Sequence, residues 1–153
     1  MELLLKNKMI NNPNIEQVKT LIKKSAEKPI IVKAQDESFN RKILEYGRFN
    51  ILLFFQENKN RKDKPKQLDS SLNHILAEIS KKNNVSIGFD LGQLRNLDKK
   101  EKALSLARIK QDIKLCRKAK VKISLINCKD KISALNLLLS LGASTQQTKG
   151  ATN

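Results

Sequence analysis

The 153-residue chain has no tryptophan, one histidine, two cysteines and five glycines that stand apart from one another. With histidine limited to His74, the sequence holds none of the histidine-based motifs that bind a catalytic metal. Isolated glycines also exclude a glycine-rich phosphate loop. Cys116 and Cys128 fit neither a disulfide framework nor a zinc pattern, and we expect both to be small buried hydrophobes. No catalytic constellation emerges from the sequence.

Long apolar runs are missing as well. The longest, "ILLFF", has five residues, far fewer than a membrane-spanning helix needs. The start of the chain, "MELLLKNKMINNPNIE", lacks the apolar region and cleavage site of a signal peptide. We therefore expect a cytoplasmic protein without a membrane partner.

Acidic residues are scarce relative to basic ones. The chain has 31 Lys and Arg against 15 Asp and Glu, a formal net charge of +16. Such an excess indicates a polyanionic partner, with RNA or DNA favoured and an anionic membrane surface second. Because aromatic residues make up only 4% of the chain, base stacking is a poor fit, and contact with phosphates and nucleic-acid shape is favoured.

The hydrophobic pattern predicts alternating strands and helices. Repeated strand–helix–strand order predicts the α/β class, a parallel sheet with flanking helices and right-handed crossovers. Five units are too few for a complete eight-unit barrel, so we expect an open sheet or an incomplete barrel. One domain should cover residues 1–142, followed by a polar, flexible tail at 143–153. Strands are expected at 3–6, 30–34, 50–55, 85–91 and 121–126, and helices at 12–28, 36–46, 69–82, 98–119 and 131–142.

Helix boundaries are predicted from capping residues. Asn12 with Pro13 suits the start of the first helix, Asp36 and Asp69 suit the second and third, and Gly47 suits the end of the second. Asp90 ends a strand, where parallel α/β folds often place functional groups. A lone carboxylate there is more typical of a helix cap or a loop ligand.

Positive charge gathers in two places. Residues 59–66, "KNRKDKPK", hold five basic side chains and one acid, and should form a loop after an interior strand. This loop suits phosphate binding and equally suits an ordinary solvated loop. A second group forms a stripe on the long helix, opposite its buried face, which is equally consistent with a solvated helical surface. The candidate contacts so far are Lys59, Arg61, Lys62, Lys64, Lys110, Lys114, Arg117 and Lys118, with His74 beside the loop and Arg41 on the second helix.

Three segments resemble ribonuclease P protein component 3, the archaeal relative of the thirty-kilodalton subunit of the eukaryotic enzyme. They are "VKAQDESFNRKILEYGRFNILLFF", "LDSSLNHILAEISKKNNVSIGFDLGQL" and "ARIKQDIKLCRKAKVKISLI". The likeness runs from about residue 30 to residue 142. The chain departs from the family by the inserted "KPKQ", by "DSS" for "DSG", by "NCKDKISAL" after the last strand, and by lacking the family's first strand–helix–strand portion.

The resemblance implies a barrel related to the polymerase and histidinol-phosphatase phosphoesterases, left incomplete here and without their metal-binding histidines. It also implies a non-catalytic, RNA-binding subunit of ribonuclease P, which removes the 5′ leader from precursor tRNA. Its partners would be ribonuclease P RNA, protein component 2 and, through the holoenzyme, precursor tRNA. The protein would bind no cofactor itself, and Mg²⁺ would sit on the RNA. The family's RNA or partner contacts would correspond to Arg41, Arg61, Lys62, His74, Arg108, Arg117 and Lys118.

Two other functions stay open from the sequence. One is a stand-alone metal-dependent phosphoesterase of the related barrel superfamily, although no metal-binding cluster stands out in the sequence. The other is a basic scaffold that binds only protein. Hydrolysis of a generic phosphodiester would distinguish the first, and salt-insensitive binding of component 2 without RNA affinity would distinguish the second.

Overall fold

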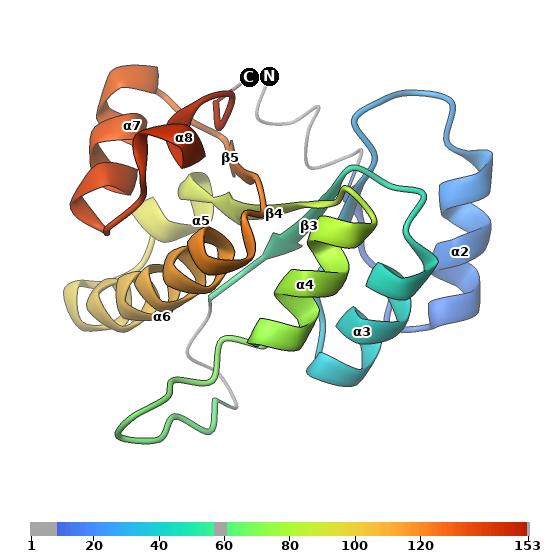
Figure 1. Ribbon diagram of the computed structural model, residues 1–153, viewed down its shortest axis with the longest axis horizontal. Helices are drawn as coiled ribbons and strands as arrows, with labels where there is room; N and C mark the ends of the chain where they lie inside the picture. Colours follow the sequence, from blue (N-terminus) through green and yellow to red (C-terminus); the bar gives the residue numbers. More distant parts are fainter. Residues whose placement is uncertain (1–8, 57–60, 153) are drawn as a thin grey trace.

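A computed structural model describes residues 9–56 and 61–152 (Figure 1). Its centre is one five-stranded sheet in which every pairing is parallel and the spatial order follows the chain order. The predicted α/β class with a parallel sheet is confirmed. The strands are β1 (Met9–Ile10), β2 (Ile31–Lys33), β3 (Ile51–Phe54), β4 (Ser86–Asp90) and β5 (Ile123–Ile126). The helices are α2 (Ile15–Lys24), α3 (Glu37–Tyr46), α4 (His74–Lys82), α5 (Leu91–Arg95), α6 (Lys99–Ala119), α7 (Lys131–Ser140) and α8 (Thr145–Thr148).

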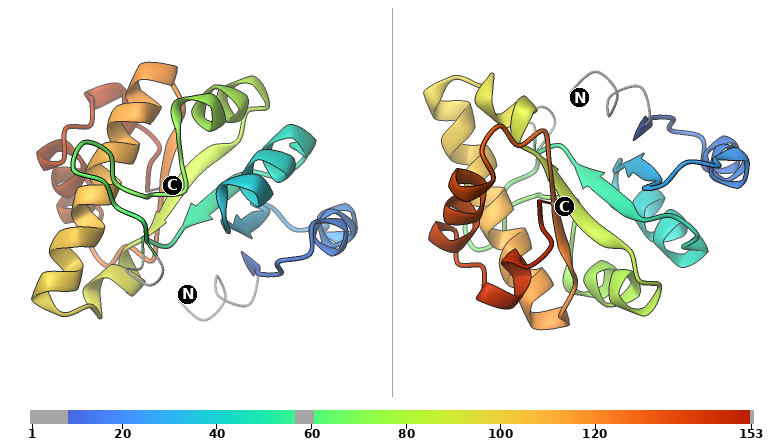
Figure 2. Two further views of the ribbon diagram at one scale, coloured as in Figure 1. Left: turned by 90° about the horizontal axis from the view of Figure 1, so that it is seen from below. Right: turned by 90° about the horizontal axis from the view of Figure 1, so that it is seen from above.

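This strand order is the one found along the wall of a barrel. When each strand joins the next by a right-handed crossover, the connecting helices collect on one face of the sheet. Accordingly α2 packs on α3, α3 on α4 and α4 on α6, side by side around the curved sheet (Figure 2). Within the described residues the sheet stays open between β1 and β5, which is compatible with an incomplete barrel.

The two faces of the sheet hold cores of different size. Under the helices lies the main core, to which Val32, Leu52 and Ile87 contribute from successive strands. The other face holds a small cluster of Ile31, Ile51 and Leu53. Gly88 leaves room for this cluster, because a Cβ there would stand 2.6 Å from Ile51 Cγ2.

The predicted helix caps are confirmed at one start and differ at two. Asp36 caps α3 and Gly47 (φ 71°) ends it, as predicted. Asp98 caps α6, at the start predicted for the long helix. The first helix begins at Ile15 rather than at Pro13, since the Asn14 side chain accepts the N–H groups of residues 16 and 17. The third helix, α4, is capped by Asn73 instead of Asp69, whose carboxylate accepts the Lys62 N–H.

The ends of the chain also differ from expectation. The strand predicted at residues 3–6 lies outside the described residues. After α7, the segment expected to be a polar tail packs onto the domain instead: Gln147 of α8 is buried and donates to Ile113 O at 3.1 Å. Ala151 is 1% exposed, and its carbonyl accepts the Leu125 N–H at 2.6 Å. The C-terminal segment therefore covers the outer edge of β5.

Helix α5, which directly follows β4, was not anticipated. Its cap is Asp90, which accepts from the N–H groups of Gly92 and Gln93 and from Asn127 Nδ2. The cap role favoured for Asp90 is therefore confirmed. Cys116 is buried as expected, and Cys128 is partly buried. Within the described part of the chain no helix is long and apolar enough to cross a membrane.

Candidate nucleic-acid interface

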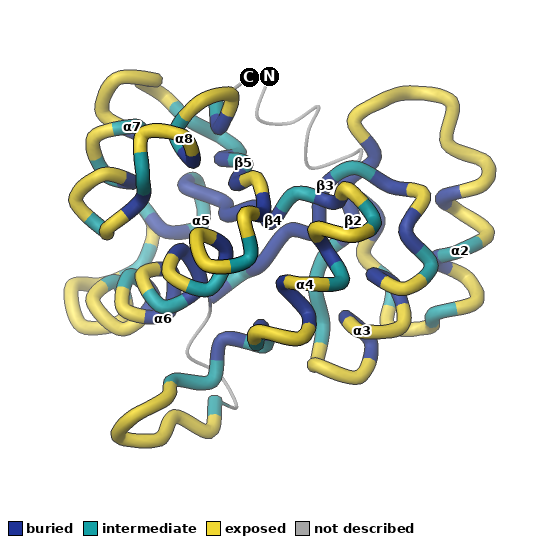
Figure 3. The backbone as a smooth tube through the Cα atoms, viewed as in Figure 1, coloured by how far each residue is buried: buried dark blue, intermediate teal, exposed yellow. Residues whose placement is uncertain are grey.

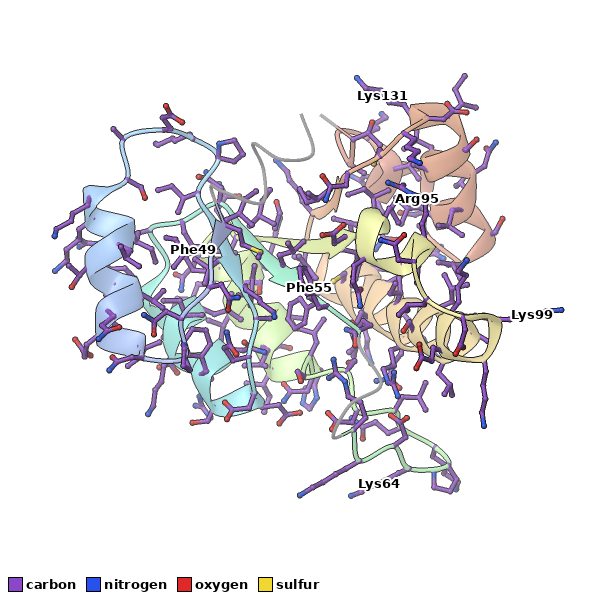
Figure 4. The ribbon with its side chains drawn as sticks, turned by 180° about the vertical axis from the view of Figure 1, so that it is seen from behind. Phe49, Phe55, Lys64, Arg95, Lys99 and Lys131 are labelled. Atoms are coloured by element: carbon purple, nitrogen blue, oxygen red, sulfur yellow. The ribbon has the colours of Figure 1, made fainter. Side chains whose placement is uncertain are left out.

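The predicted loop at residues 59–66 is part of a longer connection from β3 to α4, which lies beside the carboxyl edge of the sheet. We call this connection the basic loop, and its described part is residues 61–73. Its tip is a tight turn in which Lys64 and Gln67 exchange backbone hydrogen bonds of 2.9 and 3.2 Å around Pro65 and Lys66. The inserted "KPKQ" is this turn. The side chains at the tip are exposed, and Lys64 points away from the body of the molecule (Figures 3 and 4).

The arginines of this region point inward. Arg108 of α6 is 2% exposed and holds Asp63 with two hydrogen bonds, Nη2–Oδ2 at 2.6 Å and Nε–Oδ1 at 3.3 Å. Arg61 donates to Phe55 O at 2.7 Å, Ser71 Oγ at 3.0 Å and Asp69 O at 3.2 Å. A planar guanidinium suits such multiple contacts. Two of the predicted RNA contacts thus serve to fix the loop.

Further contacts join the loop to α6 and β3. Gln111 accepts from the N–H of Leu68 at 2.8 Å and donates to the carbonyl of the same residue at 2.9 Å. Gln56, directly after β3, is 2% exposed and donates to Ser70 O at 3.1 Å and Asp112 Oδ2 at 2.6 Å. The loop is therefore anchored at both ends and along α6, although it contains neither helix nor strand.

The charged residues that hold the loop on α6, which together with Gln56 and Gln111 we call the anchor, have shifted pKa values. The hydrogen bonds from Arg108 hold the pKa of Asp63 below its ordinary value. Burial lowers the pKa of Arg61, and the nearby positive charge of Arg108 lowers it further. Asp112 is fully buried, and burial raises its pKa well above the ordinary 3.8. Asp63 thus offsets the charge of Arg108, and the outward positive charge of the described loop comes from lysines.

The remaining candidate contacts divide by location. Lys62 and Lys64 are exposed on the loop, and His74 is exposed at the first position of α4. Arg41 is exposed on α3 and pairs with Glu45 at 3.0 Å. Lys59 lies outside the described residues. The predicted stripe on α6 is exposed at Lys110, Lys114, Arg117 and Lys118.

The acid near that stripe is not part of the exposed surface. Asp112, with 0% exposure, belongs to the buried face of α6 together with Ser105 and Arg108. These three polar residues follow one another at spacings of three and four, the spacing of the apolar residues on that face. Polar residues at this spacing are the sequence signal that could have predicted the anchor. The predictions from sequence included neither the anchor nor its members Gln56 and Gln111.

Two further basic residues lie near the carboxyl ends of strands, Lys33 at the end of β2 and Arg95 at the end of α5, which follows β4. Lys33 Nζ lies 4.7 Å from the ring centroid of Phe55, and Arg95 of α5 donates to Asn127 O at 3.0 Å. Among the described residues no group of three or more His, Cys, Asp or Glu could hold a metal ion.

Together these features define an α/β protein with an open sheet in barrel-wall order and lysines projecting from an anchored loop beside the carboxyl edge. No protein-family model matches the chain, and no curated protein matches it. Its structure is similar to a chain from the cryo-EM structure of archaeal Ribonuclease P with mature tRNA, with a TM-score of 0.74 and 21% sequence identity. The match covers 94% of this chain and 62% of that chain. At this identity the likeness shows the fold.

Proposed function

We propose that this protein is an RNA-binding subunit of ribonuclease P that supports the catalytic RNA in removing the 5′ leader of precursor tRNA. The supporting observation is the structural similarity to a chain of an archaeal Ribonuclease P, which extends over 94% of this chain. The sequence resemblance to protein component 3 and the net charge of +16 point the same way. The partners would be ribonuclease P RNA and protein component 2, with Mg²⁺ bound by the RNA.

In this function the lysines of the basic loop contact RNA, and the arginines hold the loop in place. The exposed lysines Lys62, Lys64 and Lys66 neutralise phosphates, and each acts as a mobile point charge. Arg61 and Arg108 hold the loop against α6, so that these lysines are presented together. His74 lies where the loop enters α4 and would contact the same RNA segment.

Reconstitution tests the proposal. Ribonuclease P RNA and component 2 are assayed on precursor tRNA at limiting Mg²⁺, with and without this protein. We expect the protein to lower the Mg²⁺ requirement or raise the cleavage rate. No effect on either, or hydrolysis of a generic phosphodiester by the protein alone, would contradict the assignment.

A triple variant locates the effect. In Lys62→Gln/Lys64→Gln/Lys66→Gln we expect a weaker stimulation and RNA affinity that depends less steeply on salt, by about three in the log–log slope. The matched control, Lys42→Gln/Lys100→Gln/Lys131→Gln, removes the same charge from exposed positions on three helices. Equal losses in both triples would assign the effect to net charge and not to the loop.

A further inference from the structure

A second concentration of lysines lies at the amino edge of the sheet, away from the basic loop. The segments leading from α4 into β4 and from α6 into β5 lie side by side there, because β4 pairs with β5. Ile87 N donates to Lys122 O at 3.0 Å, which joins the second segment to the start of β4. In Figure 1 the loop extends below the sheet, whereas α4 ends at the opposite side.

These two segments enclose a small hollow, which we call the lysine recess. Lys81, Lys120 and Lys122 line it together with Ser80 and Ser86. Its volume is about 20 Å³, room for a single oxygen-sized group. All three lysines are exposed residues, and none of the described residues that line the recess is acidic.

One buried donor in the recess is unused. Ser80 is 0% exposed, and its hydroxyl has no hydrogen-bond partner among the described residues. A buried hydroxyl without a partner is costly, on the order of 1–3 kcal/mol. The hydroxyl oxygen is closed to solvent in the free protein, so the Ser80 side chain must rotate toward the recess before an oxygen atom placed there, among three positive charges, can accept this hydrogen bond.

Ordinary helix chemistry explains only part of this arrangement. Lysine near a helix C-terminus stabilises the helix dipole, which accounts for Lys81 and bears on Lys120 just after α6. Lys122 follows Val121 in the segment leading into β5 and gains nothing from that effect. A second hollow, between α2 and α3, offers a contrast: its lysines, Lys19 and Lys42, are balanced by Glu16 and Glu45.

We propose that the lysine recess is a second RNA-binding site, which takes one backbone phosphate with an oxygen on the Ser80 hydroxyl. This inference rests on the proposed function insofar as both treat the protein as an RNA binder. The loop follows the carboxyl end of β3 and the recess precedes the amino ends of β4 and β5. One molecule therefore holds two RNA segments on opposite edges of its sheet.

The experiment measures bridging. Two 12-base-pair RNA duplexes, one carrying a donor dye and one an acceptor, are mixed with the full chain below saturation. We expect energy transfer with the wild type and its loss in Lys120→Gln/Lys122→Gln, which should still bind one duplex with a salt slope shallower by about two. The control Lys19→Gln/Lys42→Gln should bridge as the wild type does.

The outcomes separate this inference from the proposed function. Undiminished bridging by Lys120→Gln/Lys122→Gln, or equal loss in the control, would overturn the recess as a site. Bridging that depends on the recess, with no effect of the protein on precursor-tRNA cleavage, would keep the recess and overturn the ribonuclease P role. A wild type that binds neither duplex would overturn both.

The serine provides an independent readout. Ser80→Ala removes a hydroxyl that has no partner in the free protein, so we expect an unchanged or higher melting temperature. The same variant should bind the duplex several-fold more weakly at the recess, measured as reduced bridging. Unchanged bridging would show that no phosphate oxygen reaches the hydroxyl.

Discussion

The basic loop and the lysine recess are both rich in positive charge, but they are built differently. In the loop, buried or half-buried arginines donate hydrogen bonds to a carboxylate and to backbone carbonyls. The exposed positive charge belongs to lysines in and beside a tight turn, outside any helix or strand. In the recess, lysines stand on short segments between helix and strand, with no acid among the described lining residues. The number of charges is thus a poor guide to their role, and the partners of each charge are a better one.

Residue type explains much of this difference. Arginine offers a rigid fork that satisfies two or three acceptors at once, so it can fix a loop that has no backbone ladder of its own. Lysine keeps a compact, well-hydrated charge on a flexible stem and suits contact with phosphate. Three predictions test this distinction, beginning with the arginine expected to matter most.

Arg108→Ala should produce the largest loss of stability. The substitution removes the buried side chain that donates to Asp63 and to Gln56 O. The carboxylate then keeps only the Asp69 N–H, and the carbonyl only the Ser105 hydroxyl, among the donors of the described residues. We expect the free energy of unfolding to fall by about 3 kcal/mol, because alanine leaves a cavity where a large and almost fully buried side chain stood. Urea denaturation followed by circular dichroism measures it.

Lys114→Ala is the control on the same helix, since its side chain is exposed. A change within about 0.5 kcal/mol is normal for such a surface position. If Arg108→Ala were equally mild, the ion pair with Asp63 would not be what holds the loop.

Asp112→Asn should have a smaller effect that depends on pH. Because burial raises the folded-state pKa of Asp112 above 3.8, the folded protein binds this proton more tightly than the unfolded chain does. Ionisation therefore costs stability as the pH rises from about 4 through the folded pKa. Asparagine carries no such charge, so the variant should equal or exceed the wild type at pH 7, by on the order of 1 kcal/mol.

Urea denaturation of both proteins from pH 4 to pH 8 measures this difference. It should grow in favour of the variant as the pH rises. A variant that becomes steadily less stable than the wild type over this range would show that ionised Asp112 stabilises the anchor.

Arg41→Ala should have the smallest effect. Arg41 and Glu45 form an exposed pair one turn apart on α3, worth about 0.3–0.5 kcal/mol. A loss of that size should shrink in 1 M salt, because salt screens exposed charges. A loss above about 1 kcal/mol that persists in salt would place Arg41 among the arginines with a structural role.

The sequence predicted the sheet better than it predicted the interface. Runs such as 50–55 are apolar on both faces, and local periodicity alone assigns them to an interior strand. The inward turn of Arg61 and Arg108 depends on the loop folding onto α6, and the two contacts that show this, Asp63 with Arg108 and Leu68 with Gln111, join residues 45 and 43 positions apart. Neighbouring Asn and Asp residues compete as caps, so the starts at Asn14 and Asn73 needed the structure. The small helix α8 and the buried Ala151 were hidden by their polar surroundings.

A sheet whose spatial order equals its chain order also has a consequence for folding. Each strand pairs with the strands that come just before and just after it, so the sheet grows by adding one strand–helix unit at a time. Pairings of this local kind keep the average sequence distance between contacts low, which favours fast folding for a parallel sheet. As in repeat proteins, loss of a unit from either edge removes the hydrogen bonds of one neighbour and leaves the other pairings intact.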